Sequence, residues 1–210
     1  MGTEGGTTSR HRLRSRGVAE RRSRILDCSR DLFASSGFHH ISMDDIAAAV
    51  GVTKPVLYRH FRSKLDLYLA VLEVETAALT RAVVDALDTV PRPAPGTGDA
   101  AVLAVLDALC IAYVSYATAA GPAGRLVFES DVLRDPRVRD LVHAPDRAAT
   151  TAAVAILSCG TAPGTHPRPD LTATARTCVA FARAAVADAA PSPAERSPWA
   201  QSVARALVVR

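Results

Sequence analysis

Apolar residues recur along the chain with the period of an α-helix rather than in the alternation of a strand. One predicted helix ends at Gly37, and the residues on its inward face are Ile25, Ser29, Leu32, Phe33 and Ser36. A longer helix is predicted from about residue 63, and further helices over about 99–120, 123–131, 135–157, 170–190 and 198–209. The pattern therefore predicts an all-α protein.

Three segments rich in proline and glycine separate the predicted helices: 91–98, 160–169 and 191–198. Because both residues break helices, these segments are expected to be loops. Hydrophobic residues make up 49% of the 210 residues, whereas aromatic residues make up only 5%. The interior must therefore be built mainly from alanine, valine and leucine, which favours closely packed helices.

Positive charge is concentrated near the N-terminus. Residues 1–64 contain 12 Lys and Arg against 6 Asp and Glu, and the remainder has a small net negative charge. This asymmetry favours a polyanionic partner, although charge alone leaves a membrane surface as an alternative. Residues 1–17 contain one bulky apolar side chain, Leu13, and are expected to form a disordered basic arm that either contacts DNA or only aids solubility.

The first residues lack the apolar stretch of a secretory signal, and no run of about 18 uncharged apolar residues occurs. A cytoplasmic protein without a membrane partner is therefore expected. The four cysteines are far apart and lack the spacing of metal ligands: Cys28, Cys110, Cys159 and Cys178. We expect buried free thiols, no metal and no cofactor.

Residues 42–61 predict two short helices joined by a tight turn. Ser42 is suited to cap the first helix and Gly51 to end it. Thr53 is suited to cap the second helix, and Pro55 fits its first turn because no amide hydrogen is needed there. The apolar or small residues that would hold the two helices together are Ile46, Ala47, Val50, Leu57 and Phe61.

The other residues of the second helix face outwards or lie at its N-terminal tip: Lys54, Pro55, Val56, Tyr58, Arg59 and His60. Such donors and small apolar groups suit a DNA groove, where Val56 would meet a thymine methyl. Taken singly, Tyr58 and His60 would be solvated surface residues. Arg59 has a second interpretation, in which it points sideways to pair with an acidic neighbour.

The residue order Ile46-Ala47, Gly51-Val52, Leu57-Tyr58, His60-Phe61 and Lys64, with Phe33-Ala34, Gly37 and Phe38 upstream, covers about 45 residues. This order resembles the DNA-binding region of the tetracycline-repressor (TetR) family of transcriptional regulators. The resemblance implies a three-helix helix-turn-helix DNA-binding domain over 18–64 and a helical ligand-binding and dimerisation domain over 65–210.

The resemblance also implies which residues contact DNA: Ser42, Met43, Thr53, Lys54, Pro55, Val56, Tyr58, Arg59, His60 and Lys64. Ser42 and Met43 would touch the DNA backbone at the start of the first helix, and Lys64 a phosphate. Met43 departs from the family, which more often has a small hydroxyl residue there. Pro55 and Val56 occupy variable positions, so the operator sequence does not carry over.

By the same resemblance the protein is a homodimer on a palindromic operator, because one recognition helix contacts too few base pairs. The helices over about 170–190 and 198–209 would pair between subunits, the alternative being that they only pack within their own chain. A small, mainly apolar effector would bind among the middle helices and release the DNA. The candidate residues are Leu106, Cys110, Tyr113, Tyr116, Arg125, Phe128 and Glu129, each of which has core packing or a solvated ion pair as its plainer interpretation.

Enzymatic motifs are missing from the sequence, including GxSxG, HExxH, a Walker loop and a dinucleotide-binding glycine pattern. We therefore expect no catalysis. The sequence predicts a transcriptional repressor, with an activator or a sequence-independent architectural DNA-binding protein as the alternatives.

Overall fold

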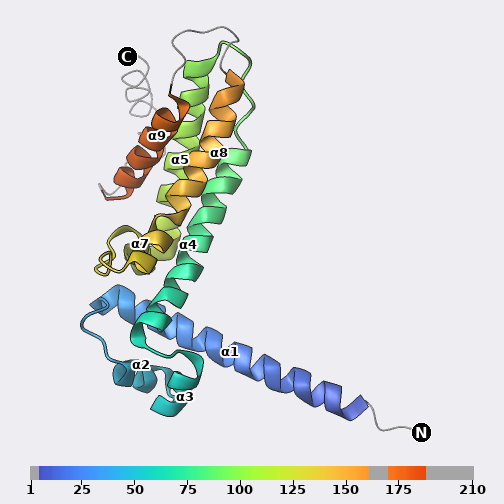
Figure 1. Cartoon of the computed structure of the whole chain (residues 1–210), viewed down its shortest axis with the longest axis vertical. Helices are drawn as coiled ribbons and strands as arrows, with labels where there is room; N and C mark the ends of the chain where they lie inside the picture. Colours follow the sequence, from blue (N-terminus) through green and yellow to red (C-terminus); the bar gives the residue numbers. More distant parts are fainter. Residues whose placement is uncertain (1–4, 161–169, 188–210) are drawn as a thin grey trace. The chain divides into compact units, whose positions relative to one another are not determined.

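The computed structural model describes residues 5–160 and 170–187, with side chains from residue 17 onward, and every regular element in these ranges is helical. In chain order the helices are α1 (Gly5–Ser36), α2 (Met43–Val50), α3 (Lys54–His60), α4 (Lys64–Asp88), α5 (Gly98–Ala120), the short 3-10 helix η1 (Gly121–Ala123), α6 (Gly124–Phe128), α7 (Pro136–Val142), α8 (Ala144–Gly160) and α9 (Leu171–Ala187) (Figure 1). The chain divides within α4 into an N-terminal unit, Met1–Glu73, and a C-terminal unit, Val74–Arg210.

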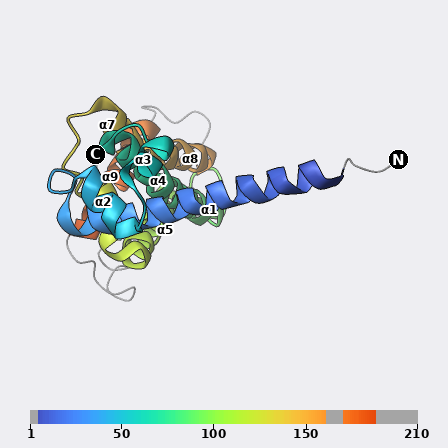
Figure 2. The same cartoon turned by 90° about the horizontal axis from the view of Figure 1, so that it is seen from below.

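The N-terminal unit is built around aromatic side chains from α1, α4 and the loop after α1. The ring of Tyr68 meets the rings of Phe33 and Phe38 edge-on, with 5.1 Å between ring centres in each case. Ile46 of α2 and Leu57 of α3 are fully buried in the same unit. These contacts fix α2 and α3 against the C-terminal half of α1, while the first turns of α1 extend past them (Figure 2).

Helix α1 begins at Gly5, so the expectation of a disordered arm over residues 1–17 is wrong from residue 5 onward. The segment is rich in arginine, which has a high helix propensity. Extending an existing helix also avoids the free-energy cost of nucleating a new one, because each added residue forms a hydrogen bond to a turn that is already folded. The packed half of α1 therefore extends toward the N-terminus.

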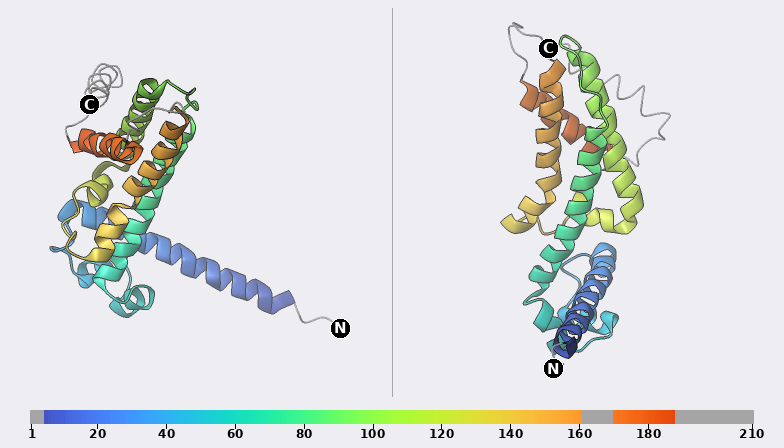
Figure 3. Two further views of the ribbon diagram at one scale, coloured as in Figure 1. Left: turned by 45° about the horizontal axis from the view of Figure 1, so that its top comes forward. Right: turned by 90° about the vertical axis from the view of Figure 1, so that its right-hand side faces the viewer.

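The C-terminal unit places α9 across α5 and α8 (Figures 1 and 3). Small residues occupy the closest positions, and Ala149, Ala153, Ala175 and Ala182 are all completely buried. Larger aliphatic residues such as Leu106 fill the remaining core. The alanine-rich composition thus produces close packing between helices, as the sequence predicts.

The predicted helix over 135–157 is two helices in the structure. Helix α7 ends at Val142 and α8 begins at Ala144, with Pro145 in the first turn of α8. The proline ring has no amide hydrogen and clashes with the carbonyl group four residues earlier, so a continuous helix is interrupted there. The predicted helix over 198–209, and the loops over 161–169 and 191–198, lie outside the described residues.

One helical stretch of the described chain, Gly98–Phe128, is long and apolar enough by length and composition to cross a membrane. Half of its most apolar window is buried within the protein, as a core helix would be. Asp107 lies within this stretch, and burial raises the pKa of its carboxyl group. Among the described residues no group of histidine, cysteine and acidic side chains has the arrangement of a metal site.

All four cysteines are free thiols. Cys110 and Cys178 are buried, and burial raises the pKa of the Cys178 thiol to about 11. Cys28 and Cys159 are only half-buried, so the expectation of burial is correct for two of the four. The Cys178 thiol therefore remains protonated at neutral pH, and both buried cysteines pack as small apolar residues.

Candidate nucleic-acid interface and effector cavity

The start and end of α2 are set by local interactions. The Oγ of Ser42 accepts a hydrogen bond from the amide of Asp45, and the carboxylate of Asp45 accepts one from the amide of Ser42. At the other end Gly51 has φ of 74°, a left-handed conformation that favours glycine, and its amide bonds the carbonyls of Ala47 and Ala48. The turn to α3 follows directly.

Helix α3 begins with Lys54 and Pro55, and its fully buried Leu57 fixes the helix on the core. The ammonium group of Lys54 lies 2.9 Å from the carboxylate of Asp44 on α2. Both side chains are more than half exposed, so this ion pair contributes little to stability and leaves Lys54 accessible to another anion. Tyr58 is 43% exposed.

His60, at the end of α3, lies among basic side chains. Partial burial lowers the pKa of its imidazole from the usual 6.5, and neighbouring guanidinium groups lower it further. Those groups belong to Arg21 and Arg22 of α1 and to Arg59 of α3. The guanidinium carbon of Arg22 lies 4.6 Å from the centre of the Phe61 ring. This proximity of like charges, together with exposed donors on α3, makes a surface suited to an anionic backbone.

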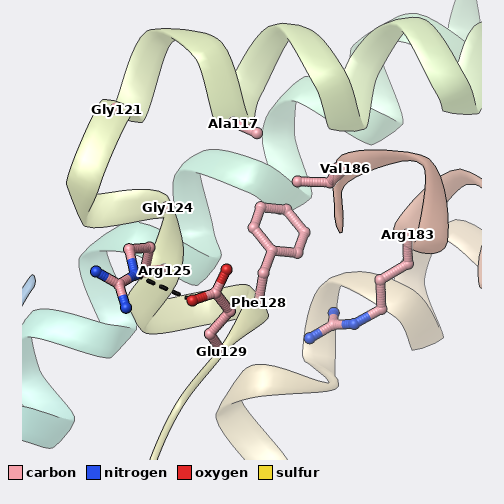
Figure 4. Close-up of a pocket in the computed structure, with 8 residues that line it drawn as sticks. All are labelled: Ala117, Gly121, Gly124, Arg125, Phe128, Glu129, Arg183 and Val186. Atoms are coloured by element: carbon pink, nitrogen blue, oxygen red, sulfur yellow. Dashed lines mark hydrogen bonds and ion pairs between the residues drawn. The ribbon is translucent and has the colours of Figure 1, made fainter. Parts of the chain in front are cut away.

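The C-terminal unit contains a cavity of about 260 Å³ formed by the end of α5 and by η1, α6 and α9. Phe128 lies between the Arg125–Glu129 ion pair and Arg183 (Figure 4). Ala117 and Val186 complete the apolar part of the wall. The cavity is slightly smaller than a typical pocket for a drug-sized molecule, so it suits a small ligand with both apolar and charged parts.

The family model for bacterial regulatory proteins of the tetR family matches residues 25–71. The chain is also 37% identical, over 139 residues, to the HTH-type transcriptional activator FasR of Mycolicibacterium smegmatis. The alignment covers 66% of this chain and spans 59% of the length of FasR. The segment that the family model matches contains α2, the turn and α3 in full. Residues 25–71 therefore match the DNA-binding region of the tetR family.

Solved structures of TetR-like proteins share the fold. A TetR-like transcriptional regulator from Rhodococcus sp. RHA1 superposes with a TM-score of 0.66 and 22% identity over 90% of this chain and 97% of that one. AibR, in complex with isovaleryl coenzyme A and operator DNA, gives a TM-score of 0.56 and 17% identity over 80% of this chain and 86% of AibR. These likenesses confirm the all-α fold with an N-terminal helix-turn-helix.

Two residues that the TetR resemblance assigns to DNA contact have their side chains occupied elsewhere. The Nζ of Lys64 donates to the carbonyl oxygens of Phe38 and Ile41, each at 2.8 Å, and lies 4.3 Å from the centre of the Phe38 ring. The Met43 side chain is buried with 7% exposed. Both DNA contacts stay predictions with a structural alternative, in which Lys64 holds the loop between α1 and α2 and Met43 packs in the core.

The other predicted DNA-contact residues lie at the surface of α3 or immediately before the first residue of a helix. Exposed positions are Ser42, Thr53, Lys54, Pro55, Tyr58 and Arg59, and half-buried ones are Val56 and His60. Ser42 also donates from its hydroxyl to Asp45 at 2.7 Å. Thr53 precedes α3 but makes no side-chain cap. The contribution of Arg21 and Arg22 was missed, although their adjacency within the basic N-terminal segment was visible in the sequence.

Of the predicted effector residues, the structure brings Arg125, Phe128 and Glu129 together on the cavity wall. The other four are buried and do not line this cavity, so their contact with an effector stays a prediction: Leu106, Cys110, Tyr113 and Tyr116. The Tyr113 hydroxyl donates to Asp146 at 2.6 Å and that of Tyr116 to Glu75 at 2.9 Å. The sequence missed Ala117, Arg183 and Val186, because only the fold brings α9 beside α6.

Proposed function

We propose that this chain is a DNA-binding transcriptional regulator of the TetR family that acts on a palindromic operator. The observation that carries the proposal is the grouping of exposed Lys54, Tyr58 and Arg59 on α3 with Arg21 and Arg22 of α1. Side chains at the N-terminal end of the recognition helix would read base edges, and the guanidinium groups would bind flanking phosphates.

The regulator acts as a homodimer, because two recognition helices are needed to read both halves of a palindrome. Helix α9 provides a surface for this contact together with α8, where a shallow groove of about 580 Å³ contains Val179 and Ala180. Small residues in such a groove would allow a helix of the second subunit to approach closely. The segment 198–209 is proposed to add to this interface.

A small effector binds the cavity beside Phe128 and changes the affinity for DNA. Supporting this proposal, the cavity combines apolar wall residues with Arg125, Glu129 and Arg183. AibR, which shares the fold, is a protein whose structure holds both isovaleryl coenzyme A and operator DNA. The effector would release the DNA by favouring the conformation that binds it less tightly.

Repression is the proposed consequence of operator binding, and activation is the second candidate. Activation is favoured by one observation, the 37% identity to FasR, which is an activator. The two differ in operator position and in the sign of the change in transcription. Transcription in vitro from the native promoter, with and without the protein, separates them: repression lowers the transcript yield and activation raises it.

Selection of bound duplexes from a random pool by the purified full chain tests the DNA-binding proposal. We expect an enriched palindrome, and we expect Tyr58→Ala to weaken its binding by about 1–3 kcal/mol if Tyr58 contacts DNA. Arg30→Gln is the matched control, since Arg30 pairs with Asp31 elsewhere on α1. Failure to enrich any sequence, with uniform affinity for all duplexes, would replace the regulator with an architectural DNA-binding protein.

A further inference from the structure

Arg183 on α9 joins three helices at one side of the cavity. Its Nη1 lies 3.2 Å from both carboxylate oxygens of Asp146 on α8, and its Nη2 donates to the carbonyl oxygen of Val127 on α6 at 2.7 Å. The guanidinium carbon lies 5.3 Å from the centre of the Phe128 ring. The same side chain therefore crosslinks the unit and forms part of the cavity wall.

Asp146 has further donors besides Arg183. The hydroxyl of Tyr113 donates to it at 2.6 Å, and Nδ1 of His143 lies 3.4 Å from its other carboxylate oxygen. Burial raises the pKa of Tyr113 well above its usual value, so the phenol keeps its proton and remains a donor. Asp146 would therefore keep a short hydrogen bond if Arg183 turned toward a ligand. This second donor removes much of the penalty for leaving a partly buried carboxylate unpaired.

A second guanidinium group lies on the opposite side of Phe128. Arg125 pairs with Glu129 at 3.0 Å, and both side chains are about 60% exposed. Water weakens an ion pair at this exposure, so its guanidinium group is available to a stronger acceptor. The apolar ring is therefore flanked by two guanidinium groups, each held by a carboxylate that an external anion can replace (Figure 4).

We propose that the cavity binds an amphiphilic organic anion, a short hydrocarbon chain ending in a carboxylate or phosphate, with Arg183 turning from Asp146 to bind the anionic end. This inference rests on the proposed effector function and names the chemical class of its ligand. The hydrocarbon part covers Phe128, Ala117 and Val186, and a planar guanidinium group binds either anionic end in a bidentate manner. An uncharged apolar ligand would gain the contacts with the apolar wall but not the bidentate hydrogen bonds to the guanidinium group.

The exchange also gives the ligand an effect on α9. Arg183 is a wall residue both of the cavity and of the groove between α8 and α9. When its guanidinium group leaves Asp146, the ion pair between α8 and α9 is lost and a contact to the ligand replaces it. Ligand binding thereby changes the ion pairing of residues beside the proposed dimer contact. The ligand then interacts differently with the conformations that bind DNA tightly and weakly, as regulation requires.

The test compares two probes of equal chain length, octanoate and uncharged octanamide, by isothermal titration calorimetry on the full chain. We expect the wild type to bind octanoate at least about ten-fold more tightly than octanamide. Arg183→Gln should remove this preference by weakening octanoate binding about ten-fold or more, and Arg183→Lys should retain part of it. Asp146→Asn keeps an acceptor for Tyr113 but releases Arg183, so it should tighten octanoate binding by about three-fold or more.

Arg176→Gln is the matched control, because Arg176 lies two turns earlier on α9 and does not line the cavity. It should bind both probes as the wild type does, and thermal unfolding checks that every variant is folded. Equal binding of the two probes by the wild type would overturn the anion assignment while leaving an apolar effector in place. Binding of neither probe would overturn the assignment, and operator selection tests the regulator function independently of both results.

Discussion

The ammonium group of Lys64 is surrounded by two carbonyl oxygens and an aromatic face, which leaves little of its charge available to a phosphate. Lys64→Met should lower the free energy of unfolding by about 1–3 kcal/mol, because two carbonyl groups lose a charged donor. The slope of DNA affinity against salt should stay unchanged under conditions in which the variant is folded. Urea unfolding and DNA binding at several salt concentrations measure the two effects.

Lys54→Met is the control for Lys64, since Lys54 has an exposed partner in Asp44. It should cost less than about 1 kcal/mol of stability and lower the salt slope by about one unit. The assignment of Lys64 as a structural residue would be lost if the two variants gave the opposite pattern.

His60 links DNA binding to pH. Its pKa in the free protein lies below 6.5 because of burial and the adjacent arginines, and a bound phosphate would raise it. The DNA complex then takes up a proton, so affinity should increase as pH falls through the interval between the free and bound pKa values. Titrating an operator at about pH 6 and pH 8 should show tighter binding at the lower pH for the wild type and a smaller change for His60→Gln. Identical pH dependence in both would contradict the linkage.

The residues predicted correctly from the sequence are those with local partners. Ser42 and Gly51 follow rules for helix ends that need only a few neighbouring residues. The carbonyl acceptors of Lys64 were not predictable, because they are 26 and 23 residues away in the chain. The acceptor of the Tyr113 hydroxyl was not predictable for the same reason, since Asp146 is 33 residues away. Residue roles were therefore predictable only where the partner was close in sequence.

At the level of elements, α1 contributes more to the candidate interface than the helix-turn-helix pattern indicates. Arg21 and Arg22 act on His60 from a different helix, a relation that only the packing of α1 beside α3 creates. The existence of α1, α2, α3 and α5 was predictable from periodicity and caps. The break before α8 was signalled by Pro145, but helical periodicity on both sides concealed it.

Arg21→Gln tests the part played by α1. We expect weaker DNA binding and a salt slope smaller by about one unit, because one phosphate contact and its released counterion are lost. The expected change is the same on every duplex, since a phosphate contact carries no base preference. Arg30→Gln should leave both the affinity and the slope unchanged, and equal slopes for all three proteins would remove α1 from the interface.

At the level of the whole molecule, the sequence predicts an all-α protein and the described helices confirm that fold class, while the chain divides into two compact units. The position of the division within α4 was not predictable, because helical periodicity continues without interruption through Glu73 and Val74. The cavity was not predictable either, because its wall combines residues of α5 and α6 with residues of α9. Such assemblies depend on which helix faces meet, and one helical period is compatible with several arrangements.

A charged side chain in the groove between α8 and α9 should disrupt the proposed dimer. Ala180 is exposed on α9 and lines the groove beside α8, so Ala180→Arg would place a long charged side chain where a second subunit must approach. We expect sedimentation equilibrium to show a dimer for the wild type and a larger monomer fraction for this variant. Affinity for a palindrome should fall by about ten-fold or more. Affinity for non-specific DNA, expressed per subunit, should change little, because each monomer keeps its own α3.

Ala78→Arg, at an exposed position on α4, should leave the wild-type mass and affinity intact. A dimer unaffected by Ala180→Arg would place the subunit contact on another face and separate effector binding beside α9 from assembly.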